Sequence, residues 1–202
     1  MRGSLRARLP SLPPPRTLVL FMTPSLFFVT GVCGVGKTSV IPQLKLLLPS
    51  DQFRIHDLDE RGVPDGGGRD WRLAETQYWM DVAAKNAEAG LSTVVCGFAN
   101  PEELGGLKLS SNLKATYILL DADEETIRQR LAGRYTDAGS EAEVQRATND
   151  SLETFIQNNV SFSSVLREIC RQQSCAIVDT KSLEIEEVAD QIAYRIVKSL
   201  KT

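Results

Sequence analysis

Short apolar runs and longer amphipathic stretches alternate along this chain of 202 residues. Each apolar run has the length of a buried strand and is bounded by turn residues. The runs occupy residues 26–30, 53–56, 92–96, 114–120 and 175–178. Strands that alternate with helices predict an α/β domain whose parallel sheet is covered by helices on both faces.

The stretches between the runs carry apolar residues at helical spacing. They occupy residues 39–48, 71–89, 124–132, 141–173 and 185–200. Asp123 is the expected N-cap of the third helix, and residues 133–140 are expected to form a short mobile loop. The second helix is expected to bury one face against the core, made of Trp71, Ala74, Tyr78, Val82 and Ala83.

Residues 31–38 follow the first predicted strand and read Gly-Val-Cys-Gly-Val-Gly-Lys-Thr. This is the Gly-x4-Gly-Lys-[Ser/Thr] pattern of a phosphate-binding P-loop. Its glycines let main-chain N–H groups turn inward on an anion, and the helix expected to begin near Lys37 adds its positive end. The predicted nucleotide-binding residues are Gly31, Val32, Cys33, Gly34, Val35, Gly36, Lys37, Thr38 and Ser39.

Two carboxylates follow the second predicted strand. Asp57 and Asp59 alternate along the chain, so both can face one side while Leu58 points away. The carboxyl ends of parallel strands meet at one rim of the sheet, which places both acids near the P-loop. The Thr38 hydroxyl suits Mg²⁺; one of the two carboxylates can orient water on that ion, and the other can hold an acceptor hydroxyl and take its proton. The alternative is that both acids are ordinary turn and cap residues.

Three arginines are further candidates. Arg72 and Glu75 are spaced i, i+3 on a helix, so they can pair and hold the guanidinium for an anionic or polar substrate. Arg130 and Arg134 lie one helical turn apart at the start of the expected loop, where they can stack on a base and bridge transferring phosphates. In each case the alternative is a solvated surface charge.

Composition excludes other classes of partner. The net charge of −3 leaves no basic surface for nucleic acid or for an anionic membrane. The four cysteines are scattered and His56 is the only histidine, so the sequence lacks zinc-ligand spacing. Free thiols are typical of a cytoplasmic protein. We expect a monomer or a weak homodimer that binds a small-molecule phosphoryl acceptor.

The amino terminus differs from the rest of the chain. Its first sixteen residues hold four arginines and no acid, but several prolines break any amphipathic helix. We interpret residues 1–24 as a disordered or spurious extension, with a targeting peptide or a start at Met22 as alternatives. The catalytic domain then covers residues 25–202.

From residue 26 onward the sequence resembles the P-loop small-molecule kinases, such as shikimate kinase, gluconate kinase and the nucleoside monophosphate kinases. Four pieces carry the likeness, at residues 31–38, 55–60, 71–75 and 130–134. The resemblance implies a three-layer P-loop NTPase fold with a five-stranded parallel sheet and a short lid. Overall, the sequence is most similar to uncharacterised bacterial members.

The resemblance also implies roles for matching residues. Shikimate kinase has a magnesium-associated and a substrate-side carboxylate where this chain has Asp57 and Asp59, and a substrate-binding arginine that matches Arg72. The lid arginines of adenylate kinase match Arg130 and Arg134.

Residues 177–188 are similar to the loop and helix beside the adenine in these kinases, which makes Asp179 and Thr180 nucleotide-binding candidates. Gly97 stands where shikimate kinase has three glycines along its substrate, so we expect Gly97 to bind substrate while shikimate itself is disfavoured. Adenylate kinase lacks the paired aspartates, because a phosphate acceptor needs no deprotonation. Asp59 therefore favours a hydroxyl acceptor.

The sequence thus predicts an ATP- and Mg²⁺-dependent kinase acting on a hydroxyl of a small metabolite or nucleoside, with Lys37, Asp59 and Arg134 as catalytic residues. A nucleoside monophosphate kinase is the alternative within the same class. A nucleotide-dependent ATPase or switch is the alternative from another class. Against it, the chain lacks both the [Asn/Thr]-Lys-x-Asp guanine signature and the long apolar strand ending in Asp-Glu that is usual in ATPases.

Overall fold

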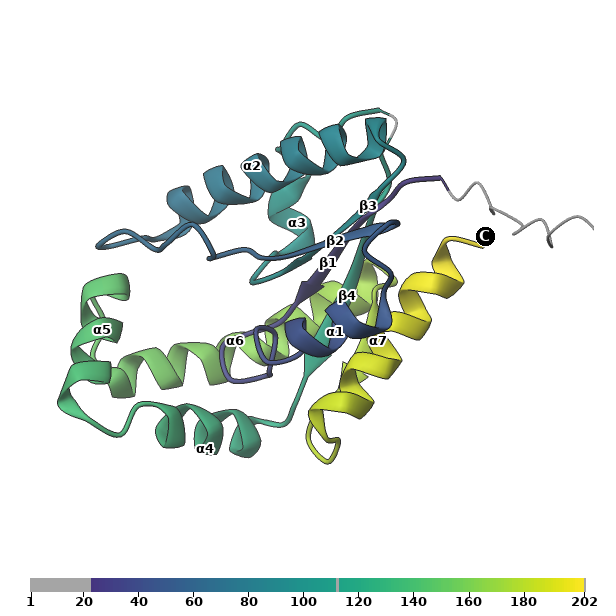
Figure 1. Cartoon of the computed structure of the whole chain (residues 1–202). Coiled ribbons are helices and arrows are strands. Elements are labelled where there is room, and N and C mark those ends of the chain that lie inside the picture. The colour runs from purple at the N-terminus through teal and green to yellow at the C-terminus, as the bar shows by residue number, and fades with distance from the viewer. Residues whose placement is uncertain (1–22, 112, 202) are drawn as a thin grey trace, which may run out of the picture.

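The computed structural model describes residues 23–111 and 113–201. Five parallel strands form one sheet in the order β2-β3-β1-β4-β5 (Figure 1). They are β1 (Leu26–Thr30), β2 (Phe53–Asp57), β3 (Ser92–Cys96), β4 (Ala115–Asp121) and β5 (Ala176–Asp179). The five strands predicted from the apolar runs are confirmed, each to within one residue at either end.

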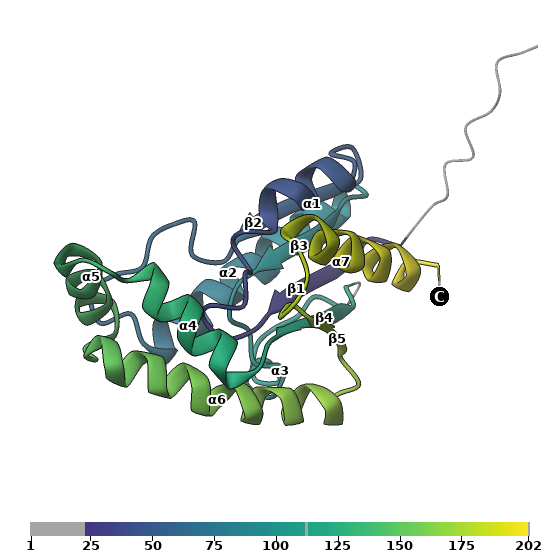
Figure 2. The ribbon, with the colours of Figure 1, turned by 90° about the horizontal axis from the view of Figure 1, so that it is seen from below.

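Helices cover both faces of this sheet. In the described part of the chain they are α1 (Ile41–Leu47), α2 (Arg69–Glu88), α3 (Pro101–Leu104), α4 (Glu124–Arg134), α5 (Ala138–Thr148), α6 (Leu152–Gln172) and α7 (Ile185–Ser199). Helices α1 and α7 pack together on one face, while α2, α3 and α6 lie on the other (Figure 2). The fold is therefore the expected three-layer α/β arrangement.

The central strand β1 shows why the strands of this sheet have continuous apolar sequences. Phe27 and Val29 belong to the core cluster that contains α1 and α7, whereas Leu26 and Phe28 belong to the cluster that contains α2. All four side chains are fully buried. Burying one such side chain stabilises the fold by about 1.5–3 kcal/mol, so both faces of β1 contribute.

The start of α1 differs from the expectation that it begins near Lys37. Pro42 has no N–H to give to the Thr38 carbonyl, and the N–H of Ile41 bonds that carbonyl instead, at 3.2 Å. Residues 37–40 therefore form a turn, and the regular helix begins at Ile41.

The buried face of α2 was predicted only in part. Ala83 is buried and Val82 packs against the same core cluster, but Ala74 is exposed. Thr76, Trp79 and Met80 are buried, whereas Tyr78 is 40% exposed. The Trp79 indole donates a hydrogen bond to the Leu58 carbonyl, and this contact sets which side of the helix meets the sheet.

The loop expected at residues 133–140 is shorter than predicted, because α4 extends to Arg134 and α5 begins at Ala138. The Asp137 carboxylate accepts from the N–H groups of Gly139 and Ser140, and the Ser140 side chain completes a capping box. Asn149, with a φ of 62°, ends α5, so the helices predicted within residues 141–173 are α5 and α6. The segment between α4 and α6 consequently consists mostly of the helix α5 rather than of a loop.

The proposed N-terminal extension lies outside the described residues, except for Thr23 and Pro24. Among the helices described, none is both long and apolar enough to cross a membrane.

Candidate active site

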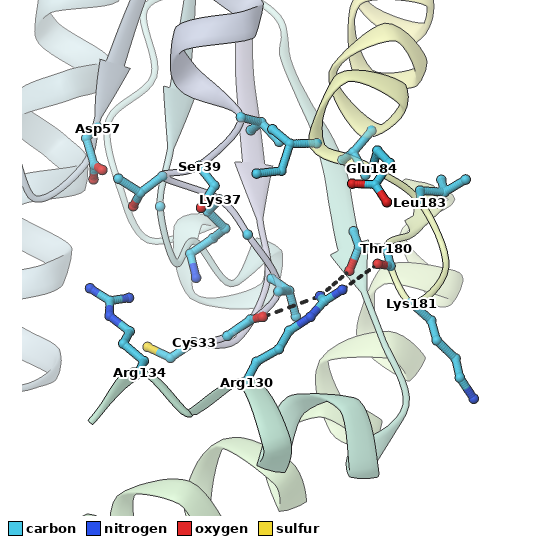
Figure 3. Close-up of a pocket in the computed structure, with 18 of the residues that line it drawn as sticks. Cys33, Lys37, Ser39, Asp57, Arg130, Arg134, Thr180, Lys181, Leu183 and Glu184 are labelled. Atoms are coloured by element: carbon cyan, nitrogen blue, oxygen red, sulfur yellow. Dashed lines mark hydrogen bonds between the residues drawn. The ribbon is translucent and has the colours of Figure 1, made fainter. Parts of the chain in front are cut away.

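A cavity of about 730 Å³ opens at the carboxyl ends of the strands (Figure 3). Its walls come from the P-loop, from the turn after β2, from α4 and from the loop between β5 and α7. The lining residues that the sequence had singled out are Cys33, Gly34, Val35, Gly36, Lys37, Thr38, Ser39, Asp57, Asp59, Gly97, Arg130, Arg134 and Thr180. Tertiary folding thus brings together pieces that are far apart in the sequence.

The P-loop has the backbone that its glycines were expected to allow. Gly31 has a φ of 152°, and a Cβ there would lie 2.5 Å from the Leu120 carbonyl oxygen. Gly36 has a φ of 98° with nothing within 4 Å of a hypothetical Cβ, so its conformation alone demands glycine. Gly31 and Val32 lie in the buried base of the loop, outside the cavity lining.

The ammonium of Lys37 donates a hydrogen bond to the Val32 carbonyl at 2.8 Å. The side chain therefore folds back over its own loop, with its charge beside the loop N–H groups. The positive charge of Lys37 also acts to lower the pKa of the Asp59 carboxyl group.

Asn159 of α6 holds the P-loop from outside, and sequence reasoning missed it. Its side-chain oxygen accepts from the Cys33 N–H at 2.9 Å, while its amide donates to the Phe155 carbonyl. No motif marked Asn159, because the contact joins positions 126 residues apart.

The two acids after β2 lie at the same cavity as the P-loop, and Leu58 between them is buried in the core. The Asp59 N–H donates to the Asp57 carboxylate at 3.0 Å, and the Asp57 N–H donates to the Glu60 carboxylate at 3.1 Å. Burial raises the pKa of Asp59, the negative charge of Asp57 raises it further, and Lys37 only partly opposes both effects. Asp59 is thus a carboxyl group that holds its proton more strongly than usual.

The donor set near the P-loop fits Mg²⁺. The Thr38 hydroxyl and the Asp57 carboxylate both line the cavity, and hard oxygen donors are those that Mg²⁺ prefers. Among residues 23–111 and 113–201, no group of three His, Cys, Asp or Glu side chains could hold a metal ion by itself. Two protein oxygens suit an ion that takes its remaining ligands from water and phosphates.

Arg130 links α4 to the loop after β5. Its guanidinium donates to the Thr180 hydroxyl at 3.0 Å, to the Thr180 carbonyl at 2.7 Å and to the Gly34 carbonyl at 3.5 Å. Thr180 is in turn fixed by a bond from its N–H to the Asp121 carbonyl. Figure 3 shows Arg130 crossing the cavity wall between these loops. The guanidinium is therefore held in one orientation.

Arg134, the last residue of α4, also lines the cavity. Its guanidinium lies 5.3 Å from the centre of the Tyr135 ring. In Figure 3 it points from α4 toward the side of the cavity that holds Lys37 and Asp57.

No protein-family model matches the sequence, and a comparison with curated proteins found no significant match. Solved structures do match. A protein named APE1195 has a TM-score of 0.59 at 17% identity, covering 89% of this chain and 98% of its own. Shikimate kinase from Acinetobacter baumannii, in complex with shikimate, has a TM-score of 0.52 at 15% identity, with 89% and 96% covered. A protein from Chloroflexus aurantiacus with a provisional kinase assignment has a TM-score of 0.58 at 16% identity, with 85% and 98% covered.

The chain has the fold of the P-loop small-molecule kinases. Sequence identities of 15–17% support the fold alone. The three remaining residues predicted from the sequence, Arg72, Gly97 and Asp179, lie in different positions relative to the cavity.

Arg72 lies outside the cavity lining of this kinase fold, and its expected pairing with Glu75 was wrong. Its guanidinium donates to the Glu103 carboxylate at 2.7 Å and lies 4.6 Å from the centre of the Phe98 ring. Glu75 instead contacts Arg61 at 3.4 Å. Arg72 pairs with Glu103 rather than with Glu75 because α3 brings Glu103 to the face of α2 that carries Arg72.

Gly97 lines the cavity, but packing explains why it is glycine. A Cβ at this position would lie 2.1 Å from the Leu58 Cβ. Such a distance is impossible without moving the turn that carries Asp57 and Asp59. Asp179 lies outside the lining, and its carboxylate accepts from the Lys181 N–H at 2.9 Å.

More residues of the β5–α7 loop line the cavity than the sequence predicted. The further lining residues come from the start of α1, the end of α4, the β5–α7 loop and the first turn of α7, and are Val40, Tyr135, Lys181, Ser182, Leu183, Glu184, Ile185 and Val188. The sequence could have predicted the loop residues, because ligands bind beyond the carboxyl ends of parallel strands and this loop follows β5.

Proposed function

We propose that this protein is an ATP- and Mg²⁺-dependent phosphotransferase that phosphorylates a hydroxyl group of a small metabolite or nucleoside. The observation that carries the proposal is the shared cavity of Lys37, Asp57 and Asp59. A phosphate-binding loop by itself would explain only nucleotide binding. The two carboxylates beside it would supply a metal ligand and a base for phosphoryl transfer as well.

The nucleotide would bind with its phosphates in the P-loop and its base beside Arg130 and the β5–α7 loop. Main-chain N–H groups of residues 34–39 neutralise the phosphates without reorganisation, because the glycines fix the loop beforehand. The Lys37 ammonium would exchange the Val32 carbonyl for a phosphate oxygen, which is a stronger, charge-assisted partner.

In the proposed reaction the acceptor oxygen forms a bond to the γ-phosphorus while its proton passes to the Asp59 carboxylate. The bond between the γ-phosphorus and the oxygen shared with the β-phosphate breaks, and ADP leaves. The raised pKa of Asp59 suits this step, since it makes the carboxylate a better proton acceptor. Lys37 and Arg134 would offset charge on the transferring group. Mg²⁺, held by Thr38 and Asp57, would supply Lewis-acid charge at the phosphate oxygens.

Contacts between α5 and the loop before α2 would help to exclude water from the site. The Gly66 N–H donates to the Arg146 carbonyl of α5 at 2.9 Å, and the Arg146 side chain lies 3.5 Å from the Asp65 carboxylate. Figures 1 and 2 both place the loop before α2 beside α5. A covered site would protect the phosphoryl group from hydrolysis.

The paired carboxylates of Asp57 and Asp59 also favour a hydroxyl over a phosphate acceptor. A nucleoside monophosphate would bring its negative charge toward a site that already holds Asp57 and Asp59. A monophosphate kinase is therefore the weaker alternative.

The test is to incubate the protein with Mg²⁺ and γ-labelled ATP against a panel of polyols, sugars, hydroxy acids, nucleosides and nucleoside monophosphates. We expect label to pass to a hydroxyl compound in the native protein and not in the Asp59→Asn variant. Transfer to monophosphates alone would favour the first alternative. Tight ATP binding with no acceptor labelled would contradict phosphoryl transfer and favour the switch.

A further inference from the structure

The segment that carries the two acids is fixed at successive backbone groups. The Leu58 N–H donates to the Cys96 carbonyl at 2.8 Å, and the Leu58 carbonyl accepts from the Trp79 indole N–H at 3.0 Å. The N–H groups of Asp57 and Asp59 bond carboxylates within the turn itself. The Trp79 bond is the one of these four that comes from a helix.

The indole of Trp79 has little freedom. It is 3% exposed and packs in the same core cluster as Leu58 and Met80. The His56 ring lies 4.4 Å from the Trp79 ring, and the Tyr78 ring meets its edge at 5.1 Å. Packing on several sides therefore aims the N–H at the Leu58 carbonyl.

Leu58 is held from the opposite side as well. Gly97 leaves room for the Leu58 Cβ at the end of β3, where any Cβ on residue 97 would collide with it. The residue between the two acids is thus confined between β3 and α2. A shift of Leu58 in either direction would move Asp57 and Asp59 together.

A buried carbonyl that loses its donor is unfavourable, so the backbone moves to find another partner. Removing the Trp79 N–H would let the Leu58 carbonyl turn away from α2. Phosphoryl transfer tolerates little displacement of the groups that place the metal and the acceptor.

We propose that Trp79 is a positioning residue, whose indole N–H sets the placement of the Asp57 and Asp59 carboxylates through the Leu58 carbonyl. The role in catalysis rests on the proposed function. Trp79 acts from behind the site and lies outside the cavity lining, so it is not expected to contact nucleotide or acceptor.

The deciding variant is Trp79→Phe, which keeps an aromatic ring and removes the N–H. Met80→Ala is the matched control, since Met80 is equally buried on the same helix and in the same cluster. Both variants are expected to lower the melting temperature. We expect kcat to fall about tenfold or more in Trp79→Phe alone, with the KM for ATP changed less than about twofold.

A second measurement needs no acceptor. Mn²⁺ suits the same oxygen ligands as Mg²⁺, and its binding in the presence of ATP can be followed by electron paramagnetic resonance. We expect Trp79→Phe to weaken Mn²⁺ binding by about threefold or more and Met80→Ala to leave it unchanged. This result decides the role of Trp79 even if the native protein labels no acceptor, in which case the proposed function alone fails.

Equal kcat and equal Mn²⁺ affinity in both variants would overturn the proposal and leave Trp79 a packing residue. If Trp79→Phe does not fold, benzothienylalanine introduced at position 79 replaces the N–H by sulfur at nearly constant shape. Native kcat and Mn²⁺ affinity in that protein would likewise overturn the proposal, whereas their loss would support it.

Discussion

The Lys37 ammonium and the Val32 carbonyl are joined by a hydrogen bond of 2.8 Å within the P-loop. The ammonium group is thus bonded to a neutral carbonyl, although a triphosphate would attract it more strongly. Because a phosphate oxygen is the stronger acceptor, nucleotide binding is expected to break this bond and turn the ammonium into the cavity.

Lys37→Met should lower kcat/KM for phosphoryl transfer by about 10²-fold or more, because the ammonium offsets charge that develops on the transferring phosphate. The matched control is Lys45→Met on the exposed side of α1, which makes the same change in charge. Steady-state kinetics with the labelled acceptor provide the measurement. Equal activity in the two variants would show that Lys37 has no part in the reaction.

Asp59→Asn should cost about 10²-fold or more in kcat with a hydroxyl acceptor, since the amide cannot take the proton. In the native protein the pKa of Asp59 is raised by burial and by Asp57. Its ionised form is therefore lost as pH falls through a value above the ordinary 3.8, and kcat/KM should decline there. A pH profile that continues flat down to pH 4 would contradict this assignment.

The same carboxyl group should lower stability at neutral pH. A raised pKa means that folded Asp59 binds its proton more tightly than unfolded Asp59, so stability falls as pH rises above 3.8 through the raised value. Asp59→Asn removes this cost. In magnesium-free buffer we expect the variant to melt at a higher temperature than the native protein at pH 7, with the gain disappearing near pH 4. A lower melting temperature at pH 7 would count against the burial effect.

Arg130→Met should raise the KM for ATP by about tenfold or more, because Arg130 holds the Thr180 carbonyl and hydroxyl at the nucleotide end of the cavity. The KM for the acceptor should change little. Arg128→Met serves as the control, since Arg128 contacts Glu153 and Gln157 on the exposed side of α4. Comparable KM values for ATP in the two variants would refute the role of Arg130.

Glu103→Gln should destabilise the fold by about 1.5–3 kcal/mol at pH 7. Burial acts to raise the pKa of Glu103, but hydrogen bonds from Arg72 and Arg69 outweigh it and leave the pKa lowered. This stability is present above the ordinary value of 4.5 and is lost as pH falls through the lower folded value. Urea unfolding should therefore show the two proteins converging at acid pH. A constant difference between pH 7 and pH 3 would contradict the ion pairs.

Gly97→Ala should reduce kcat more than it reduces acceptor affinity, because the new methyl group would meet the Leu58 Cβ and displace both acids. Gly106→Ala is the control, since a Cβ at Gly106 meets only ordinary contacts. An increase in acceptor KM at unchanged kcat would instead indicate the direct substrate contact expected from the sequence.

The sequence by itself determined the sheet and the P-loop. A strand buried on both faces needs an uninterrupted apolar run, which is a local property of the chain, so β1 through β5 could be placed within a residue. The backbone of Gly31 and Gly36 is equally local, since glycine adopts φ values of 152° and 98° far more readily than residues with a side chain. The rule that parallel strands present ligands at their carboxyl ends then placed Asp57 and Asp59 at the P-loop.

Only the tertiary structure decided the partners of the long polar side chains. Arg72 bonds Glu103 across 31 residues of sequence rather than Glu75 within its own helix. Arg130 reaches Thr180 across 50 residues. Asn159 and Trp79 carry no motif, yet each bonds a backbone group of the site. Spacing along a helix limits which pairs can meet, but the energy of a pair depends on distance in space and on burial, and packing between elements sets both.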